Sequence, residues 1–402
     1  MGVSSPPADA FTTGGDSCTL DGVQIALGVT GSIAAVKTVE LAHELRRRGA
    51  SVRAVLSESA RGIITPAAVE FATDNPVVTE LTGRVEHVEL CGTDGWADVL
   101  LIAPTTANTV GKIAAAIDDT PVTTCATTAL GAQTPVVVAP AMHEPMYNHP
   151  GVLDAIERVE SWGVPFVSPR IEEGKAKIAT NDAIALTVAR TAGQTPLSGK
   201  HVVVTSGATA ERIDPVRTIT NRASGRTGRA IARACYVRGA SVTLVHDGPD
   251  VPYADVRAIE SATEMLAAVE DTAPAADALV SAAAISDYTT DTAAQKLRSG
   301  ESRTLELEPT PKLIDTIREK HPSLPIVGHK LEPGGDDAQL ISAARATLER
   351  AGLSFVVAND ASVLGDDRSR ALLVTETDST EYAGSKTGLG LTIADRLSEL
   401  LA

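Results

Sequence analysis

The sequence predicts two α/β domains, each built on a mostly parallel β-sheet. An apolar strand, a glycine-containing turn, an amphipathic helix and a second strand follow one another twice, from residue 23 and again from residue 201. Each of these helices closes on a glycine, Gly49 in the first repeat and Gly239 in the second. The 402 residues suffice for roughly two or three domains of ordinary size. Alternating strands and helices are typical of parallel sheets, because parallel neighbours need a crossover connection.

In the first domain, expected over residues 21–190, buried strands alternate with helices. Short apolar runs bounded by turn residues predict strands that are covered on both faces. Residues 1–20, rich in Ser, Pro, Thr and Gly, are expected to be disordered. The expected order after them is strand 23–29, helix 39–45, strand 51–56, strand 99–103, helix 108–117 and strand 135–139.

A polar linker over residues 191–200, which carries Pro and Gly, is expected to lead into the second domain over residues 201–402. This domain repeats the pattern of the first, except that residues 368–383 predict an antiparallel strand pair. The other expected elements are strand 201–205, helix 228–238, strands 241–245, 278–283 and 325–328, helix 336–351, strand 354–358 and a closing helix at 389–401.

The composition excludes several classes of protein. A net charge of −16 would repel a nucleic-acid backbone, so no DNA or RNA partner is expected. No apolar run approaches the roughly 20 residues that span a bilayer, and the first residues do not resemble a signal peptide, so we expect a soluble, cytoplasmic chain with no membrane partner. Four scattered cysteines without CxxC spacing argue against a disulfide framework and a structural zinc site. The acidic, lysine-poor composition favours a high-salt environment, although ordinary acidic proteins share it.

Polar residues follow three strands of the first domain, where ligands bind in open α/β sheets. Gly31 and Ser32 open a helix, so free backbone N–H groups and a hydroxyl form a cradle for phosphate. Thr105, Thr106 and Asn108 follow a second strand, and the segment 140–147 with its two methionines follows a third. Taken singly, each loop is explained as well by helix capping and core filling.

Taken together and in order, these loops resemble the flavin-dependent cysteine decarboxylase family over residues 22–190. The matching segments are GSIAAVK at 31–37, APTTAN at 103–108 and PAMHEPM at 140–146. The resemblance implies a flavodoxin-like domain in which FMN oxidises the cysteine thiol of the substrate before the adjacent carboxylate is lost. The FMN-binding residues that it implies are Gly31, Ser32, Ile33, Ser57, Pro104, Thr105, Thr106, Asn108, Ala141 and Met142.

The same resemblance implies the catalytic and substrate-binding residues of this domain. It assigns His87, in the segment EHVEL, to proton transfer. Histidine is suited to this role because its side chain ordinarily titrates near neutral pH. It assigns His143 and Met146 to substrate binding, where bacterial members of the family carry Asn in place of His143. Those members also use a flap cysteine as proton donor, and the matching stretch 169–177 contains none. We assign Lys175 to this catalytic role and Lys177 to substrate binding, the alternative being ordinary solvated charges.

Residues 205–228 form the densest polar cluster of the second domain. Two glycine turns, of which the second opens a helix, predict a phosphate site that Arg217, Arg222 and Arg226 would neutralise. A dinucleotide site is the alternative. It is not preferred, because His246 and Asp247 follow the next strand in place of the usual ribose anchor.

This cluster resembles the phosphopantothenate–cysteine ligase family nearly residue by residue, and the likeness extends over residues 198–401. The matching segments are TSGATAERIDPVRTITNRASGRTG at 205–228, AAAISDY at 282–288 and AND at 358–360. The resemblance implies a Rossmann-like domain in which Asn221 stabilises an acyl-cytidylate, Arg217 binds substrate, and Mg²⁺ enters with CTP. The CTP-binding residues that it implies are Gly207, Thr209, Ser224, Gly225, Gly228, Ala283, Asp287, Lys296, Pro311, Lys312, Leu313, Ile314, His329, Arg345, Arg350, Asn359 and Asp360.

Two departures from the ligase family leave ATP open as an alternative to CTP. Bacterial members have Phe at the position of His329, and they carry lysines near the positions of Arg345 and Arg350. An arginine still pairs with phosphate. For Asp287 and Lys296, the alternative to nucleotide binding is a surface ion pair.

Together the two resemblances predict a bifunctional enzyme of coenzyme A biosynthesis. It would join L-cysteine to 4′-phosphopantothenate and then decarboxylate the product to 4′-phosphopantetheine, so the product of one domain is the substrate of the other. The alternatives are a flavin-dependent decarboxylase of another substrate and a non-catalytic FMN-binding regulatory protein. Relatives form trimers through the flavin domain and dimers through the ligase domain, so the resemblance also implies a homo-oligomer, up to a dodecamer.

Overall fold

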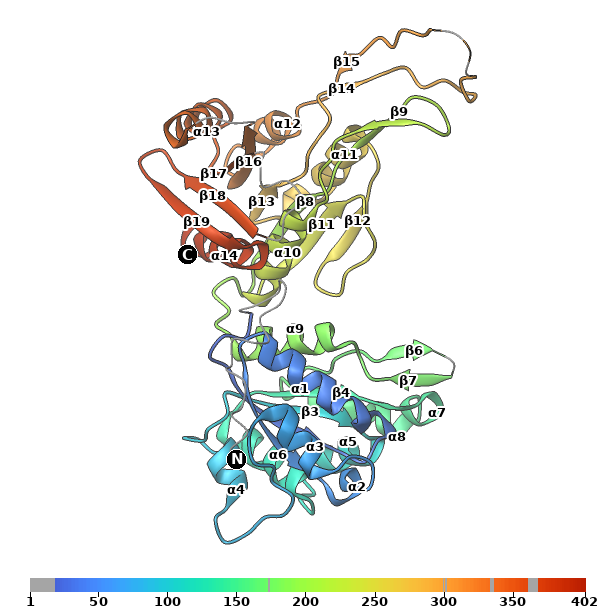
Figure 1. Ribbon diagram of the computed structural model, residues 1–402, viewed down its shortest axis with the longest axis vertical. Helices are drawn as coiled ribbons and strands as arrows, with labels where there is room; N and C mark the ends of the chain where they lie inside the picture. Colours follow the sequence, from blue (N-terminus) through green and yellow to red (C-terminus); the bar gives the residue numbers. More distant parts are fainter. Residues whose placement is uncertain (1–18, 173, 299, 301, 333–335, 361–367) are drawn as a thin grey trace, which may run out of the picture. The chain divides into compact units, whose positions relative to one another are not determined.

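The chain folds into two units that divide after Gln194 (Figure 1). The computed structural model describes residues 19–172, 174–298, 300, 302–332, 336–360 and 368–402. Each unit has its own β-sheet and its own core. Within the described residues, no helix combines the length and the apolar character that a membrane span requires.

The first unit is built on a four-stranded parallel sheet in the order β2-β1-β3-β4. Its strands are β1 (Gln24–Val29), β2 (Ser51–Leu56), β3 (Val99–Thr105) and β4 (Val136–Pro140). β3 is buried along its whole length, as expected for a strand that helices cover on both faces. The core on one face joins apolar residues of the sheet, such as Leu100 and Ile102, to helix residues such as Val122 and Val159.

Two layers of helices cover this sheet. One layer contains α3 (Pro66–Thr73) and α9 (Asn181–Ala192), both of which contact α1 (Thr38–Arg47). The other contains α4 (Glu86–Cys91), α5 (Ala107–Ala114), α6 (Pro121–Ala132) and α8 (Pro150–Glu160). The short elements η2 (Ile33–Lys37), α2 (Glu58–Arg61) and α7 (Glu144–Tyr147) follow strand ends. A small antiparallel sheet contains β5 (Met142–His143), β7 (Lys175–Lys177) and β6 (Arg170–Glu172) in that order.

The expectation of disorder over residues 1–20 is wrong at its end. Leu20 is fully buried, and its N–H donates to the Arg48 carbonyl at 3.0 Å. Arg48 is itself buried and forms ion pairs with Glu44 and Asp182, which join α1 to α9. A single leucine within a polar stretch gave no periodic signal, and its burial depends on this tertiary contact. The rest of that prediction, residues 1–18, lies outside the described residues.

The second unit contains an eight-stranded sheet in the order β12-β11-β8-β13-β16-β17-β18-β19. The first six strands pair in parallel and the last two pairings are antiparallel. The strands are β8 (His201–Ser206), β11 (Ser241–His246), β12 (Asp255–Ala258), β13 (Ala278–Ser281), β16 (Ile326–Glu332), β17 (Phe355–Asp360), β18 (Arg368–Val374) and β19 (Ser379–Ser385).

Helices also cover both faces of the second sheet. α10 (Arg226–Val237) packs against α14 (Lys386–Leu400) on one face. α11 (Ala262–Thr272), η3 (Ala273–Ala275), α12 (Leu313–Lys320) and α13 (Asp337–Ala351) lie on the other, where Met265, Ile317 and Leu348 enter the core. Two hairpin-like ribbons extend from this unit, β9 (Ala210–Arg212) with β10 (Thr218–Thr220), and β14 (Tyr288–Thr289) with β15 (Glu308–Pro309) (Figure 1).

The predicted fold class is confirmed, including the antiparallel pair at the end of the second sheet. The structure adds helices that the sequence reasoning did not predict, such as α3, α6, α8, α11 and α12, and the other differences are in element ends. β16 continues four residues beyond the predicted 325–328, because β17 pairs with it as far as Asp360. α9 runs to Ala192, two residues into the segment expected to be linker, and Leu197 is buried with its N–H on the Arg238 carbonyl of the second unit.

The contact between α10 and α14 depends on the absence of a side chain at Gly390. A Cβ atom there would lie 2.5 Å from the Ala230 carbonyl oxygen on α10. We therefore expect Gly390→Ala to lower the free energy of unfolding of the second unit by about 1–3 kcal/mol, since backbone atoms must move apart. Far-UV circular dichroism during urea titration of the full chain measures this loss.

Gly111→Ala is the matched control. Nothing lies within 4 Å of a Cβ at Gly111 in α5, so alanine should stabilise that helix by up to about 1 kcal/mol. Both tryptophans, Trp96 and Trp162, belong to the first unit, so fluorescence follows that unit alone. If Gly390→Ala unfolds at the urea concentration of the parent chain, the two helices do not pack as described.

Candidate functional site

The loops that leave the first sheet at its carboxyl edge are hydrogen-bonded to one another. The Thr30 hydroxyl donates to the Pro104 carbonyl at 2.8 Å and accepts from the Thr106 N–H at 3.2 Å. The Ser32 hydroxyl donates to the Ala141 carbonyl at 3.0 Å. The structure therefore brings together three of the segments that the sequence predicted to share a site.

Three helices or helical turns begin at this edge with a hydroxyl cap. Ser32 caps η2, Ser57 caps α2 and Thr106 caps α5, each side chain accepting from a backbone N–H of the first turn. Gly31 lies against the α2 turn, since a Cβ at Gly31 would lie 2.4 Å from the Ser59 Oγ atom. Convergent helix starts and hydroxyls form a cradle that suits a phosphate and a polyhydroxyl chain.

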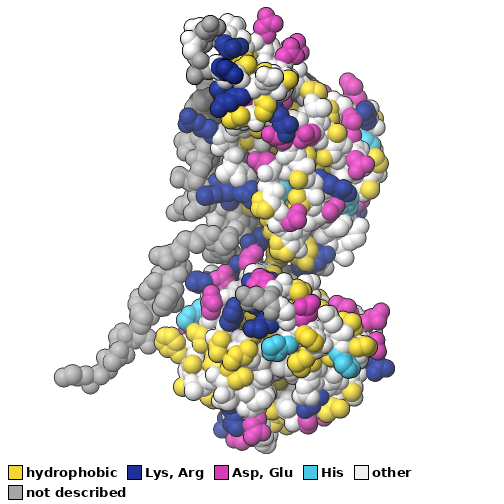
Figure 2. All heavy atoms as spheres, turned by 90° about the vertical axis from the view of Figure 1, so that its right-hand side faces the viewer, with side chains coloured by type: hydrophobic (Ala, Val, Ile, Leu, Met, Phe, Trp, Pro, Cys, Tyr) yellow, Lys and Arg dark blue, Asp and Glu magenta, His cyan; other side chains and the backbone are white. Residues whose placement is uncertain are grey.

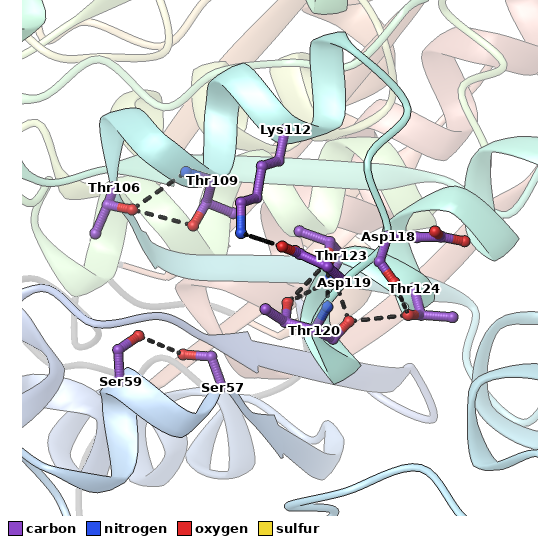
Figure 3. Close-up of polar contacts among 10 residues, drawn as sticks. All are labelled: Ser57, Ser59, Thr106, Thr109, Lys112, Asp118, Asp119, Thr120, Thr123 and Thr124. Carbon is purple, nitrogen blue, oxygen red and sulfur yellow. Dashed lines mark hydrogen bonds and ion pairs between the residues drawn. The ribbon is translucent and has the colours of Figure 1, made fainter.

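A further hydroxyl cluster at the start of α6 was missed by the sequence reasoning. Thr120 and Thr123 form a capping box, and the Thr124 hydroxyl donates to the Asp118 carbonyl at 2.9 Å. Figure 3 shows this cluster with the caps of α2 and α5, and Lys112 pairs with Asp119 between α5 and α6 at 2.7 Å. The Thr-Pro pair at 120–121 is the sequence signal that predicts such a helix start.

The other predicted FMN-binding residues differ in their exposure and in the groups that they present to a ligand. Asn108, in the first turn of α5, is exposed, and the Ile33 side chain is 78% exposed. Thr105 is fully buried, and its hydroxyl donates to the Ile102 carbonyl at 2.6 Å. Its contribution to the edge is the backbone carbonyl that accepts from the Ala141 N–H at 2.9 Å.

Within the stretch 169–177, β6 and β7 pair in antiparallel fashion, and β7 also pairs with β5, the strand after β4. Met142 pairs with Ala176 and His143 with Lys175 in this register. Side chains directly opposite each other in an antiparallel pair share a face, so His143 and Lys175 lie side by side. Both are exposed, as is Met146 on α7. Lys177 instead pairs with Glu172 across the hairpin at 3.1 Å.

His87 does not join these loops in the contacts of the described residues. It is the second residue of α4, which packs on α6. Its Nδ1 atom is buried and makes no hydrogen bond to a described residue. An unsatisfied buried nitrogen is rare and requires a partner or a role in chemistry.

In the second unit the corresponding edge lies where β8 and β13 are neighbours. The Thr205 hydroxyl accepts from the N–H groups of Ala282 and Ala283 at 3.2 Å each. The Ala284 N–H donates to the Gly207 carbonyl at 2.9 Å, and the Asn221 side-chain amide donates to the Ala284 carbonyl at 3.1 Å. Two loops and Asn221 are thus held as one surface at the point where ligands bind in doubly wound sheets.

Close backbone approach explains the glycines of this edge. Gly207 and Gly225 have φ angles of +83° and +67°, and a Cβ on Gly225 would lie 2.9 Å from the Gly207 nitrogen. Gly228, in the first turn of α10, packs on Ser206 so closely that a Cβ would lie 2.5 Å from the Ser206 Cβ. The start of α10 therefore meets the end of β8 directly, with its N–H groups at the edge where a phosphate would bind.

Several predicted nucleotide-binding residues have structural contacts. The Thr209 hydroxyl is fully buried and accepts from the Ser286 N–H at 2.8 Å, and the Ser224 carbonyl accepts from Arg229 at 2.9 Å. Asp287 pairs with Lys312 at 2.6 Å, and not with Lys296 as the surface-pair alternative had it. Both partners of this pair are exposed, so it contributes little to stability. Lys296 is exposed too.

Residues 311–314 lead into α12, and they divide between surface and core. Lys312 precedes the first turn, whereas Leu313 is buried in the core with Ile314 packed against it. Asn359 lies in β17, and its amide donates to Ser369 and to the Arg370 carbonyl across the sheet. Asp360 is the last residue of β17.

Arg350 is not brought to this edge. Because α13 connects two parallel strands, it begins at the carboxyl edge of the sheet and ends at the opposite one. Arg350 is in its last turn, about 20 Å along the axis from its start, and pairs with Asp315 at 3.0 Å. Arg345 lies about halfway along and is exposed. The two positions were assigned from the resemblance to the ligase family, and a similar position in the sequence does not fix the end of a helix on which a residue lies.

His329 lies within β16, and not in a loop after it. Neither ring nitrogen makes a hydrogen bond to a described residue, and both are buried. Burial lowers the pKa of His329 to about 4, because the charged form loses its hydration. The ring is neutral at neutral pH and offers a flat, half-buried surface.

Comparison with known proteins places both units in described families. Residues 16–193 match the Flavoprotein family, and residues 197–401 match the DNA/pantothenate metabolism flavoprotein C-terminal domain. The coenzyme A biosynthesis bifunctional protein CoaBC of Thermococcus kodakarensis is 50% identical over 88% of this chain and 89% of its own.

The chain belongs to the coenzyme A biosynthesis bifunctional protein family. The CoaBC protein of Methanocaldococcus jannaschii is 34% identical over 95% of both chains. That of Bacillus subtilis is 33% identical over 86% of this chain and 88% of its own. The family resemblance that the motifs predicted is confirmed, and with it a bifunctional enzyme of coenzyme A biosynthesis that has decarboxylase and ligase activities.

No group of three or more His, Cys, Asp or Glu side chains in the described residues is arranged to hold a metal ion. The donors at the edge of the second sheet are instead backbone N–H groups, an amide and lysines. Such donors suit an anionic phosphate.

The buried ring nitrogens of His329 make the stability of the second unit depend on pH. Its pKa is about 4 in the folded chain and near 6.5 when unfolded, so the unfolded state binds more protons between these values. The free energy of unfolding should therefore fall as the pH drops from 6.5 to 4. His329→Phe should remove about 2 kcal/mol of this loss.

Urea titrations followed by circular dichroism at pH 7.5, 6.0 and 4.5 measure the effect, and below pH 6.5 the free energy of unfolding should fall less in the variant than in the parent. NMR titration of the ring is the independent control. A ring that titrates near pH 6.5 in the folded chain would contradict the described burial.

Proposed function

We propose that the second unit joins L-cysteine to 4′-phosphopantothenate with CTP, through an acyl-cytidylate, and that the first unit decarboxylates the product to 4′-phosphopantetheine with FMN. Membership of the coenzyme A biosynthesis bifunctional family supports this proposal. The observation that carries it is the edge of each sheet, where the two sets of motif loops are held together by direct hydrogen bonds.

For the ligase reaction, the carboxylate of the substrate must be joined to a nucleotide phosphate before the cysteine amine attacks it. The N–H groups at the start of α10, with Lys296 and Lys312, would neutralise the phosphates, and Mg²⁺ would enter with CTP. Asn221, fixed on the Ala284 carbonyl, would stabilise the acyl-cytidylate. The flat, neutral ring of His329 would contact the base, and this contact would favour CTP only weakly over ATP.

For the decarboxylation, the first edge fits a flavin mononucleotide. Gly31, Ser32, Ser57 and Thr106 would hold its phosphate and ribityl chain, because hydroxyl caps and helix N–H groups converge there. When bound, FMN supplies the redox chemistry that makes loss of the carboxylate feasible. His87 would transfer the proton, and His143 would bind the substrate carboxylate.

The cross-strand pair of His143 and Lys175 supports Lys175 as the acid that replaces the missing flap cysteine. Lys175 is exposed beside His143, whereas Lys177 is paired with Glu172. Lys175 would donate its Nζ proton to the product carbon in the final reduction, for which FMN, when bound, would supply the electron pair. Bulk water would then protonate the amine again. Lys177 would bind the substrate phosphate on leaving Glu172.

A homo-oligomer is part of the proposal. Hydrophobic side chains and histidines gather on the face of the first unit shown in Figure 2. Ile33, Val36, Met146 and Ile171, which surround the flavin edge and the flap, are 48–78% exposed. Contiguous exposed apolar surface is typical of protein–protein contacts, and a second copy of this chain would cover it. We also propose a cytoplasmic location, where the substrates of such an enzyme would be formed.

The proposed pair of activities predicts the products of one assay. The purified full chain should be yellow and, with CTP, Mg²⁺, cysteine and phosphopantothenate, should release CMP, pyrophosphate and CO₂. CMP without CO₂ would exclude the decarboxylase of the first unit. CO₂ from the preformed cysteine adduct, with no nucleotide cleaved, would exclude the ligase. If AMP forms from ATP faster than CMP forms from CTP, ATP and not CTP is the nucleotide substrate.

Single substitutions should separate the two activities. His87→Asn should keep the yellow colour and lower CO₂ release by about 10²- to 10⁴-fold, because the proton-transferring group is lost. Asn221→Asp should release pyrophosphate and stall before CMP. Each variant is the control for the other, since CMP release should survive the first change and decarboxylation of the preformed adduct the second.

Lys175→Gln should lower CO₂ release with the preformed adduct and change its pH profile, while Lys177→Gln should raise the KM for the adduct. Equal kinetic constants for Lys175→Gln and the parent chain would rule out Lys175 as the acid.

A further inference from the structure

The segment that carries Lys296 is held in place by hydrogen bonds and not by packing. Residues 291–298 contain no buried side chain and no helix or strand. Four of their hydrogen bonds run to the β9–β10 hairpin, with which the segment lies side by side (Figure 1). These join Thr292 to Arg212, Ala293 to Ile213, and Leu297 to both Asp214 and Arg217. The position of Lys296 therefore depends on the hairpin.

Asp214 is the centre of this contact. Its side chain has no exposed surface, which is unusual for a carboxylate at the tip of a hairpin. One oxygen, Oδ1, accepts from the backbone N–H groups of Val216 and Arg217 at 2.8 and 2.9 Å. These two bonds form the turn between β9 and β10.

The other oxygen, Oδ2, reaches outside the turn. It accepts from the Leu297 N–H at 3.0 Å and from the Arg217 guanidinium at 3.0 Å. The same guanidinium donates to the Leu297 carbonyl at 2.9 Å. Asp214 and Arg217 together thus bind both backbone groups of the residue next to Lys296. Burial alone would raise the pKa of Asp214, but the hydrogen bonds from Val216, Leu297 and Arg217 lower it, so the carboxylate stays charged.

The β9–β10 hairpin also leads into Asn221, the residue proposed to stabilise the acyl-cytidylate. β10 leads directly into Asn221, whose amide is bonded to Ala284. A rigid connection from Asp214 through β10 to Asn221 would fix Lys296 relative to the acyl-cytidylate. A lysine has a long and flexible side chain, so its contribution depends on where its backbone is held.

We propose that Asp214 is a positioning residue of the ligase, which holds the Lys296 segment against the β9–β10 hairpin so that Lys296 meets the nucleotide. This inference rests on the proposed function of Lys296. Arg217 has the same task through two of its donors, in addition to any contact with substrate.

Asp214→Asn tests the proposal selectively. The amide oxygen can still accept from Val216 and Arg217 and keep the turn, whereas the NH₂ group cannot accept from Leu297 or the guanidinium. In the full-length protein we expect about a tenfold higher KM for CTP with kcat within about twofold, as when a binding contact is lost. Trypsin cleavage after Lys296 and Arg298 should be about tenfold faster, since the segment opens more often.

Asp395→Asn is the matched control. Asp395 binds Arg238 in an ion pair of 2.6 Å between α14 and the end of α10, away from the nucleotide edge. The KM for CTP and the rate of trypsin cleavage of the Asp395→Asn variant should equal those of the parent chain. If Asp214→Asn fails to fold, Leu297→Pro removes the same N–H from the other side, with cleavage after Arg298 as the readout.

The double variant of Asp214→Asn with Lys296→Gln distinguishes positioning from a structural role. If Asp214 acts through Lys296, the double variant should have the KM for CTP of Lys296→Gln alone, whereas independent effects would multiply. Multiplied effects, or an unchanged KM in Asp214→Asn beside a raised KM in Lys296→Gln, overturn the inference. An unchanged KM in Lys296→Gln overturns the proposed role of Lys296 itself.

Discussion

The hydrogen bonds between neighbouring loops at the carboxyl edges of the two parallel sheets are the constraint on which both candidate sites depend. A strand that ends at such an edge leaves backbone groups without partners, and these groups must be satisfied by another loop. Thr30 with Pro104 does this in the first unit, and Thr205 with Ala282 in the second. In both cases a threonine hydroxyl at a strand end binds the backbone at the end of the adjacent strand or in the loop that follows it. The same bonds that complete the fold therefore place the groups that would bind phosphate.

Under the proposed function, the two edges would meet different chemical requirements with the same kind of hydrogen bond. In the first unit, hydroxyl caps such as Ser57 and Thr106 leave a neutral, polar cradle that suits a cofactor which remains bound. In the second unit, glycines such as Gly225 and Gly228 replace side chains with backbone N–H groups, and lysines lie on exposed segments around them. A nucleotide that is cleaved in each cycle needs cations for its departing pyrophosphate. The net charge of −16 means that such cations act locally, against an acidic surface.

The sequence was sufficient to predict the sheets and the loops that follow their strands, because apolar strands and glycine turns are local signals. It was insufficient wherever position depends on tertiary contact. Leu20 is buried where its N–H binds the Arg48 carbonyl, and Arg350 lies at the far end of α13 because the helix spans the sheet. The hydroxyl cluster at Thr120 had a local signal, a Thr-Pro helix start, whose meaning depends on the neighbouring caps of α2 and α5. A motif match shows which residue types this chain shares with a family. Where each of those residues lies in space, and so what it can contact, follows only from the fold.

Asp214 shows how far this distinction reaches into the site. Within the DPVR segment the sequence drew attention to Arg217, because a cation is expected to meet phosphate. The structure gives two donors of that arginine to the Asp214 carboxylate and the Leu297 carbonyl, so the cation first serves to hold a loop. Lys296 is exposed on that loop, where its ammonium group is available to an anion. In the proposed ligase, a buried aspartate would thus divide the work between two cations, one that fixes the backbone and one that would reach the ligand.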